Sequence, residues 1–309
     1  MSTDAPLQTE DHTSAAEVYA LAHPKRSRKA AIGRIASYVG MALIVIYCVL
    51  PFYWMVVSSL RDPSMGRSTQ LIPDPISLDN FKSVFSPANN FGRSLVNSLF
   101  VSGVTTILTL VFGIVAAYAL ARLRFRGKAA VLWLIMACSM FPLVVLLPSL
   151  LKMFSSTAPF TWFPYWINTY QAVIIPYLSF GLPLAVWNLT AFFRQMPVEL
   201  EQAAMVDGCT PGEAFRKVIL PLAAPGVFTT AIIVFIGAWN EFLLALTFLQ
   251  DKNMQTATVA ISKFTGTTGF DTPYGSIMAA GVLVTVPLLI AVLIFQRRIV
   301  AGLTAGGVK

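Results

Sequence analysis

The chain has 309 residues, of which 56% are hydrophobic and only 12% are charged. A soluble domain carries about 25% charged residues, so this composition excludes an ordinary soluble protein and indicates an integral membrane protein. The formal net charge of +8 would suit a nucleic-acid-binding protein, but the basic residues stand beside apolar runs, which is the pattern of membrane topology.

Residues 1–30 mix charges with small residues and contain no apolar run. This composition predicts a disordered cytoplasmic tail and not a cleaved signal peptide. The remainder, residues 31–309, is predicted to form one membrane domain.

Six apolar segments of that domain are each long enough to cross a bilayer as a helix, which takes about 20 residues. Only the fifth contains a charged residue, Glu241. The predicted fold class is therefore an all-α polytopic membrane protein with six transmembrane helices, at residues 36–60, 94–120, 129–151, 170–193, 225–249 and 276–296. Prolines inside these segments, such as Pro142, favour kinks because each removes a helical hydrogen bond.

The basic residues are unevenly divided between the two sides of these spans. Most of the 22 lysines and arginines lie before the first span, in the second and fourth connections, and after the last span. Because basic residues are retained on the cytoplasmic side, both termini and the fourth connection, residues 194–222, are predicted to be cytoplasmic.

The connections on the other side carry local signals of their own. In residues 61–93, positions 77–80 are suited to cap a short helix whose apolar stripe is Phe81, Val84 and Phe85. Residues 152–169 are rich in aromatic side chains, which fit either an interfacial belt or a ledge facing a sugar or a partner protein. Both interpretations of this aromatic segment stay open.

The connection at residues 194–222 is polar and charged, although it joins two apolar spans. Its first half predicts a short helix, with Pro197 in the first turn and Glu199 and Glu201 near the positive end of the helix dipole. Gly208 then supplies a stop, because glycine commonly follows a helix C-terminus.

A second helix is predicted to start at once. Thr210 is a candidate N-cap, Pro211 occupies the first turn, and Glu213 lies at the capping-box spacing from Thr210. Pro221 is expected to end this helix. The acidic residues of the loop favour docking to a protein over an amphipathic helix on an anionic leaflet, where basic residues are expected.

This loop resembles the EAA motif of ABC importer permeases, which has Glu-Ala-Ala, a glycine after three residues, and Ile-x-Leu-Pro nine residues later. Here the motif is carried by residues 202–204, by Gly208 and by residues 218–221. Gln202 replaces the glutamate and Val218 replaces the isoleucine, and Glu201, one position earlier, is the alternative carboxylate. Segments at residues 71–73, 80–81, 238–242 and 295–304 are similar to the carbohydrate, MalG-like branch, closest to trehalose- or maltose-type importers.

The resemblance implies a type I importer permease fold with a cytoplasmic coupling helix, in a bacterial cell membrane. The implied partners are a second permease subunit, two ATPase subunits and an extracytoplasmic sugar-binding lipoprotein. The chain has no G-x-x-x-x-G-K-[ST] loop, since Gly127-Lys128 is followed by Ala129, so it is expected to bind no cofactor, and Mg-ATP would bind the partner ATPase. The ATPase-coupling role is carried over to Glu201, Gln202, Ala203, Ala204, Asp207 and Gly208.

Two substitutions in the loop are expected to uncouple such a transporter. Gly208→Asp and Ala204→Asp should abolish transport while leaving folding and membrane insertion intact. The reason is that the small side chains of Ala203 and Ala204 allow another backbone to approach that face of the helix closely.

Glu241 is costly inside a span, so it should face the interior or a polar partner. It would either line a path for sugars, whose hydroxyls suit planar polar groups, or form a structural hydrogen-bond knot between helices. The candidate substrate path comprises Trp239, Asn240, Glu241, Asn188 and Asn97.

Other function classes have thinner support in the sequence. A secondary transporter usually needs more than one buried charge, and an ABC permease for another solute, such as glycerol phosphate or an oligosaccharide, remains an alternative. A membrane enzyme is disfavoured because both histidines lie in the tail, so neither a catalytic residue nor a metal site is predicted. The three cysteines predict no disulfide.

Overall fold

The computed structural model describes residues 28–65, 68–264 and 273–305 of the chain. Within these residues the secondary structure is helical, apart from a single antiparallel bridge between Arg61 and Ile76. The chain divides into two units, Met1–Trp54 and Met55–Lys309. The predicted disordered segment lies mostly outside the described residues, since α2 (Arg28–Ser59) begins at its end.

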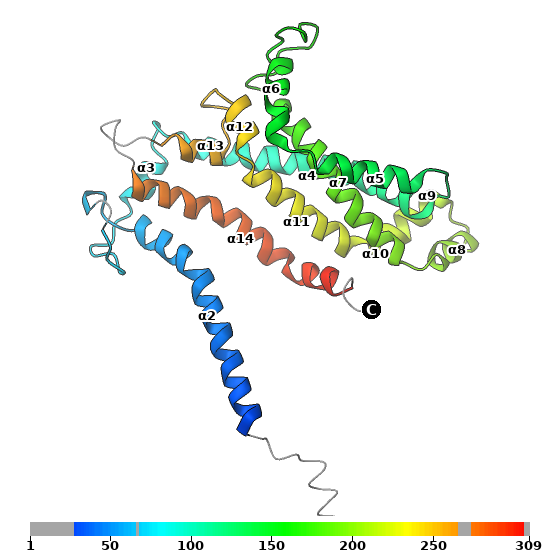
Figure 1. Ribbon diagram of the computed structural model, residues 1–309, viewed down its shortest axis with the longest axis horizontal. Coiled ribbons are helices and arrows are strands. Elements are labelled where there is room, and N and C mark those ends of the chain that lie inside the picture. Colours follow the sequence, from blue (N-terminus) through cyan, green and yellow to red (C-terminus); the bar gives the residue numbers. More distant parts are fainter. Residues whose placement is uncertain (1–27, 66–67, 265–272, 306–309) are drawn as a thin grey trace, which may run out of the picture. The chain divides into compact units, whose positions relative to one another are not determined.

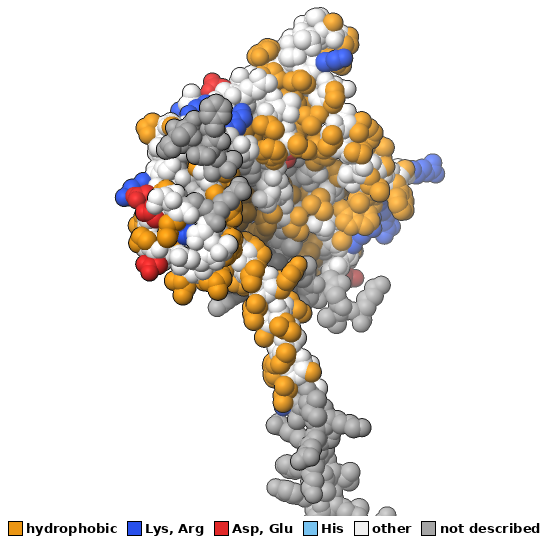
Figure 2. Space-filling model, turned by 60° about the vertical axis from the view of Figure 1, so that its left-hand side comes forward, with side chains coloured by type: hydrophobic (Ala, Val, Ile, Leu, Met, Phe, Trp, Pro, Cys, Tyr) orange, Lys and Arg blue, Asp and Glu red, His pale blue; other side chains and the backbone are white. Residues whose placement is uncertain are grey.

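The described part of the first unit is most of the long helix α2. Its apolar side chains are exposed on every side, with Ile44 66% and Tyr47 81% exposed. A helix that is apolar all round needs lipid or another protein around it. Figure 2 shows that hydrophobic side chains also cover much of the visible face of the molecule, as expected for a chain that lies in a membrane.

The second unit is built around four long helices: α4 (Phe91–Arg122), α7 (Gln171–Gln195), α11 (Ala224–Asn240) and α14 (Tyr274–Ala305). Figure 1 shows them running side by side, with α4 against α7 and α11 between α4 and α14. Small side chains allow close approach, because a Cβ added at Gly113 of α4 would lie 3.2 Å from the Ala185 Cβ of α7.

Among the described residues, four helices are long and apolar enough to cross a membrane each, namely α2, α4, α7 and α14. The count reaches six if each of two bent helix pairs, one at residues 128–154 and one at residues 211–240, forms one span. The first bent pair corrects the expectation of a continuous helix at residues 129–151. Helix α5 (Lys128–Ser139) and helix α6 (Leu143–Phe154) meet at an angle of 84°. The break falls at residues 140–142, where Pro142 is extended (ψ 121°) and has no N–H to continue the ladder.

The expected helix at residues 225–249 is also broken. Helix α11 ends at Asn240, Glu241 is extended (ψ 134°), and a short helix α12 (Leu243–Phe248) follows. The Glu241 carboxylate takes the place of the missing carbonyl acceptors, because it accepts the N–H groups of Leu244 and Ala245 at 3.0 and 3.3 Å. A helix N-terminus favours such an anion.

One end of the second unit is closed by the short helices α3 (Asp79–Val84) and α13 (Ala257–Ser262), which pack on α14. The one-turn helix η1 (Pro63–Met65) precedes α3, and α3 confirms the short helix predicted there. Val84, Phe91 and Ala279 belong to the apolar cluster that joins this end. Glycine at position 275 leaves room for the buried Asn80 side chain, because an added Cβ would lie 2.4 Å from it.

Candidate functional site

The polar loop at the other end of the unit begins with helix α8 (Glu199–Val206), which follows Pro197 by two residues. It ends as predicted at Gly208, whose φ of +90° favours glycine. The Gly208 N–H donates to the Met205 carbonyl at 3.1 Å, and the Cys209 N–H donates to the Ala204 carbonyl at 3.0 Å. These two bonds form a Schellman motif, which satisfies carbonyls that the helix end would leave free.

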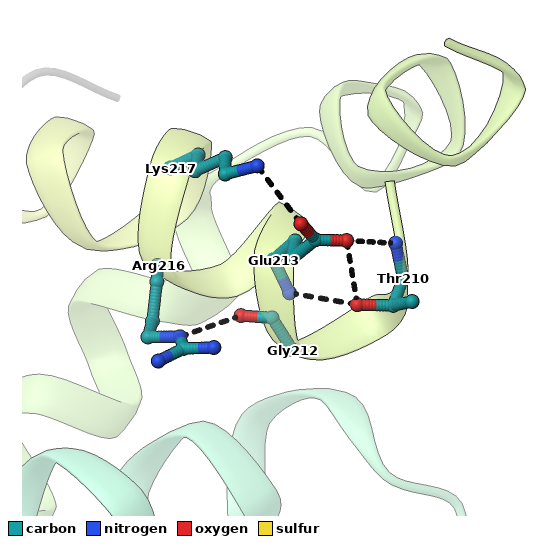
Figure 3. A network of polar contacts seen from close by, with 5 residues as sticks. All are labelled: Thr210, Gly212, Glu213, Arg216 and Lys217. Atoms are coloured by element: carbon teal, nitrogen blue, oxygen red, sulfur yellow. Dashed lines mark hydrogen bonds and ion pairs between the residues drawn. The ribbon is translucent and has the colours of Figure 1, made fainter. Parts of the chain in front are cut away.

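The second half of the loop starts with α9 (Pro211–Ala214), and the predicted capping box is confirmed. As Figure 3 shows, the Glu213 N–H donates to the Thr210 hydroxyl at 3.4 Å, and the Thr210 N–H donates to the Glu213 carboxylate at 2.9 Å. The Lys217 ammonium contacts the same carboxylate at 2.9 Å. This contact, aided by the bonds from Thr210, lowers the pKa of Glu213 to about 2.

Pro221 does not end this helix, contrary to the expectation. A π-helical turn η2 (Phe215–Ile219) leads into α10 (Leu220–Leu222), where Pro221 sits in the first turn and needs no N–H acceptor. The chain then bends by 70° into α11 at Ala223.

The outward surface of α8 and of the turn that follows it contains most of the residues predicted to couple. Gln202, Ala203, Asp207 and Gly208 are exposed. Apolar side chains flank them, and Val206 is 87% exposed. An exposed mixture of apolar and acidic groups on a capped helix is suited to dock into a complementary protein surface.

Ala204 differs from the others, because it is only 7% exposed and faces the loop's own interior. The expectation that Ala203 and Ala204 form one low outward face is therefore wrong for Ala204. We therefore no longer expect Ala204→Asp to leave folding intact, since the new carboxylate would be buried without a partner.

Glu201 also points inward. Its Oε1 lies 2.7 Å from the Nε of Arg122, at the end of α4, and both side chains are largely buried, at 13% and 8% exposure. These two atoms are not aligned for a hydrogen bond, so the attraction is between charges. The Tyr118 hydroxyl donates to the other Glu201 oxygen at 3.4 Å, and the Arg122 guanidinium donates to the Met196 carbonyl at 3.0 Å.

Aromatic packing fastens the second half of the loop to the same place. The Tyr118 ring of α4 lies 4.3 Å from the Phe215 ring of η2 and 5.8 Å from the Phe193 ring of α7, between centroids. Ile219 is fully buried in the cluster that these rings surround. The loop is thus attached to α4 by an ion pair on one side and by aromatic contacts on the other.

The candidate substrate path centres on Glu241, which lines a cavity of about 210 Å³ between α4, α7 and α11. Tyr177 and Thr105 also line this cavity, and the Tyr177 hydroxyl donates to Glu241 at 2.5 Å. The Thr105 hydroxyl is buried and makes no hydrogen bond. Three donors therefore hold the Glu241 carboxylate, which favours the interpretation as a hydrogen-bond knot, while the cavity beside it keeps the path interpretation open.

The structure does not gather the other path candidates at this cavity. Trp239 is 1% exposed, and Asn240 is exposed and donates to the Ile236 carbonyl of its own helix. Asn97 is buried elsewhere, where it donates to the carbonyls of residues 253 and 255. Asn188 is half-buried on α7.

With this geometry in place, comparison with known proteins decides the family. Residues 109–304 match the model of the binding-protein-dependent transport system inner membrane component. The chain belongs to this family. The permease is accordingly a multi-pass inner membrane transport subunit, and the ATP hydrolysis of such importers resides in a separate subunit.

Near-full-length relatives support the same assignment. The permease is 45% identical over 267 residues to the trehalose transport system permease protein SugB of Mycobacterium tuberculosis, covering 86% of this chain and 94% of the relative. It is 38% identical over 283 residues to the trehalose/maltose transport system permease protein MalG of Thermococcus litoralis, covering 91% and 99%. A solved bacterial ABC transporter for alginate import shares the fold, with a TM-score of 0.73, 18% identity and coverage of 89% and 99%.

Sequence reasoning missed Arg122 and Tyr118 as parts of the loop's architecture. A basic residue at the end of a span is explained equally well by membrane orientation. Nothing local in the sequence pairs it with a carboxylate in a later connection.

The structure has no group of three or more His, Cys, Asp or Glu suited to a metal within the residues it describes. The cysteines at 48, 138 and 209 are free.

Proposed function

We propose that this permease forms half of the translocation path of an ATP-driven importer for a disaccharide such as trehalose or maltose. The observation that carries the proposal is the near-full-length similarity to two permeases that are named for trehalose or for trehalose and maltose. The second half of the path would be a related permease subunit. A sugar-binding lipoprotein outside the membrane would deliver the substrate.

The energy would come from two ATPase subunits that bind Mg-ATP and dock on α8. The exposed residues Gln202, Ala203, Asp207 and Gly208 support this docking site, because the Schellman end and the capping box make the loop a preformed element. Closure of the ATPases would push on a rigid body and tilt the spans between inward-open and outward-open states. The loop and both termini would then face the cytoplasm, as the distribution of basic residues predicts.

We infer that this subunit would contact the sugar at the cavity beside Glu241. Its polar groups, including the unpaired Thr105 hydroxyl, suit the hydroxyls of a sugar, while the apolar lining suits its C–H faces. Trp239 and Asn97 would support the surrounding helices instead of touching the substrate, because both are buried away from this cavity.

Reconstitution of the whole complex tests the proposal. The permease should co-purify with an ATPase subunit from its own cells, and proteoliposomes containing both permeases should take up labelled trehalose or maltose only with ATP inside and the binding protein outside. Uptake that persists without the ATPase would mean a secondary transporter. ATP-driven uptake of another solute, with neither disaccharide accepted, would overturn the sugar assignment alone.

A further inference from the structure

The buried ion pair between Arg122 and Glu201 joins the loop to the second span. Arg122 ends α4, and Glu201 lies in the first turn of α8. Their charged atoms are 2.7 Å apart, and neither side chain is more than 13% exposed. The charges are therefore positioned for each other, and Glu201 does not present its carboxylate to an incoming subunit.

The same guanidinium holds two points of the loop. One nitrogen faces Glu201, and another donates to the Met196 carbonyl, just before α8 begins. Helix α8 has only 8 residues, and among them only Ala204 is buried. A helix this short is unstable alone, and one buried alanine contributes little apolar burial, so Arg122 supplies the principal attachment of α8 to a membrane-spanning helix.

We propose that Arg122 and Glu201 are positioning residues that transmit movement of α8 to α4. The inference rests on the proposed coupling to an ATPase. When the ATPase moves α8, the end of α4 must follow, because separating the charges would leave both of them buried without a partner. Docking itself falls to Gln202 and the other exposed residues, so Glu201 does not replace the missing motif glutamate.

Tyr118 strengthens this attachment from one turn earlier on α4. Its hydroxyl donates to Glu201, and its ring packs on Phe215 of η2. Both halves of the loop therefore meet on the last turns of α4. Movement of either half of the loop is therefore transmitted to α4.

The test uses the full complex of both permeases, ATPase and binding protein in proteoliposomes. The variants are Arg122→Gln, Glu201→Gln and the charge-reversed double variant Arg122→Glu with Glu201→Arg. Lys217→Gln is the matched control, because it removes a charge from the exposed pair of the same loop. The readouts are the affinity of the permease pair for the ATPase and the factor by which sugar-loaded binding protein stimulates ATP hydrolysis.

Each single variant should retain ATPase affinity within about threefold and lose at least about tenfold of the stimulation, and the double reversal should restore part of it. Arg122→Lys, which keeps the charge, tests the same point if a neutral variant fails to assemble, and it should retain most of the stimulation. A fall in ATPase affinity for Glu201→Gln but not for Arg122→Gln would make Glu201 a docking residue and overturn the inference. Unchanged stimulation in both variants would also overturn it, whereas a wild-type permease that binds no ATPase would overturn the proposed function.

Discussion

At the scale of single residues, burial separates two neighbouring alanines that the motif treats alike. Ala203 is exposed, whereas Ala204 is 7% exposed and packs inside the loop. Ala203→Asp should leave the fold intact and reduce ATPase binding at least about tenfold. Ala204→Asp should destabilise the loop by several kcal/mol, because a buried carboxylate without a partner is costly.

Thermal unfolding of the purified permease pair distinguishes these two effects, together with pull-down of the ATPase. The prediction is that only Ala204→Asp lowers the melting temperature. Equal melting temperatures for the two variants would contradict the inward orientation of Ala204.

Gly208 offers a second comparison at this scale. Its φ of +90° is a conformation in which an alanine Cβ is strained by about 1–2 kcal/mol, although no neighbouring atom lies within 4 Å of that Cβ position. Gly212 has the same open surroundings without the positive φ. Gly208→Ala should therefore loosen the end of α8, while Gly212→Ala should not, and hydrogen exchange of the loop amides would measure the difference.

At the scale of elements, the capping box predicts a specific pH dependence. The folded loop lowers the pKa of Glu213 from 4.5 to about 2. Stabilisation from a lowered pKa is fully present above the unfolded value and is lost as the pH falls towards the folded value. The loop should therefore be equally ordered from neutral pH down to about pH 5 and should loosen between about pH 4.5 and pH 2.

A spin label at a Gly212→Cys position would report this loosening as increased mobility, in a background without the native cysteines. Glu213→Gln should remove the transition in that pH range. A transition near neutral pH that survives Glu213→Gln would show that another group controls the loop.

The broken element at Glu241 gives a prediction about stability. Glu241→Ala removes the acceptor for Tyr177 and for two backbone N–H groups, so the free energy of unfolding should fall by at least about 3 kcal/mol. Asn240→Ala is the control, since its side chain bonds only within its own helix, and it should cost less than about 1 kcal/mol. Melting curves of the complex compare the stabilities of the two variants. Equal stabilities would rule out a structural hydrogen-bond network at Glu241.

The limits of sequence reasoning are clearest at this scale. The stop at Gly208 and the cap at Thr210 were predictable, because each depends on residues within four positions of the chain. The bend at Pro142 was foreseeable only as a tendency, since neighbouring helices decide whether a proline kinks a span or breaks it. The contact between Arg122 and Glu201 was not predictable, because it depends on how two distant helices pack.

At the scale of the whole molecule, the fold class followed from composition and length, while the path of the chain did not. The hydropathy of the sequence identifies six apolar segments, but it does not predict the 84° bend between α5 and α6. Two segments of a span length thus contain two helices each. The six-span prediction therefore rests on the length of the apolar segments alone. The family match supports the polytopic assignment independently.

Topology can be tested by labelling in intact cells. Cys209 in the loop should be protected from a membrane-impermeant maleimide added outside, whereas a Trp162→Cys variant should react, since Trp162 is 76% exposed on a connection predicted to face outward. The variant should be made with Cys48 and Cys138 replaced, because both are exposed in the helices. Labelling of Cys209 and not of position 162 would reverse the proposed orientation.

The two ion pairs of the loop should respond differently to ionic strength. The Glu213–Lys217 pair is open to solvent, because the Glu213 side chain is 35% exposed and the Lys217 side chain is 63% exposed. Concentrated salt therefore weakens their attraction, since the Debye length at 1 M is only about 3 Å. The Arg122–Glu201 pair is shielded from counterions by its burial. A high-salt wash that strips a peripheral subunit should therefore leave α8 fastened to α4, and the permease should accept a fresh ATPase once the salt is removed.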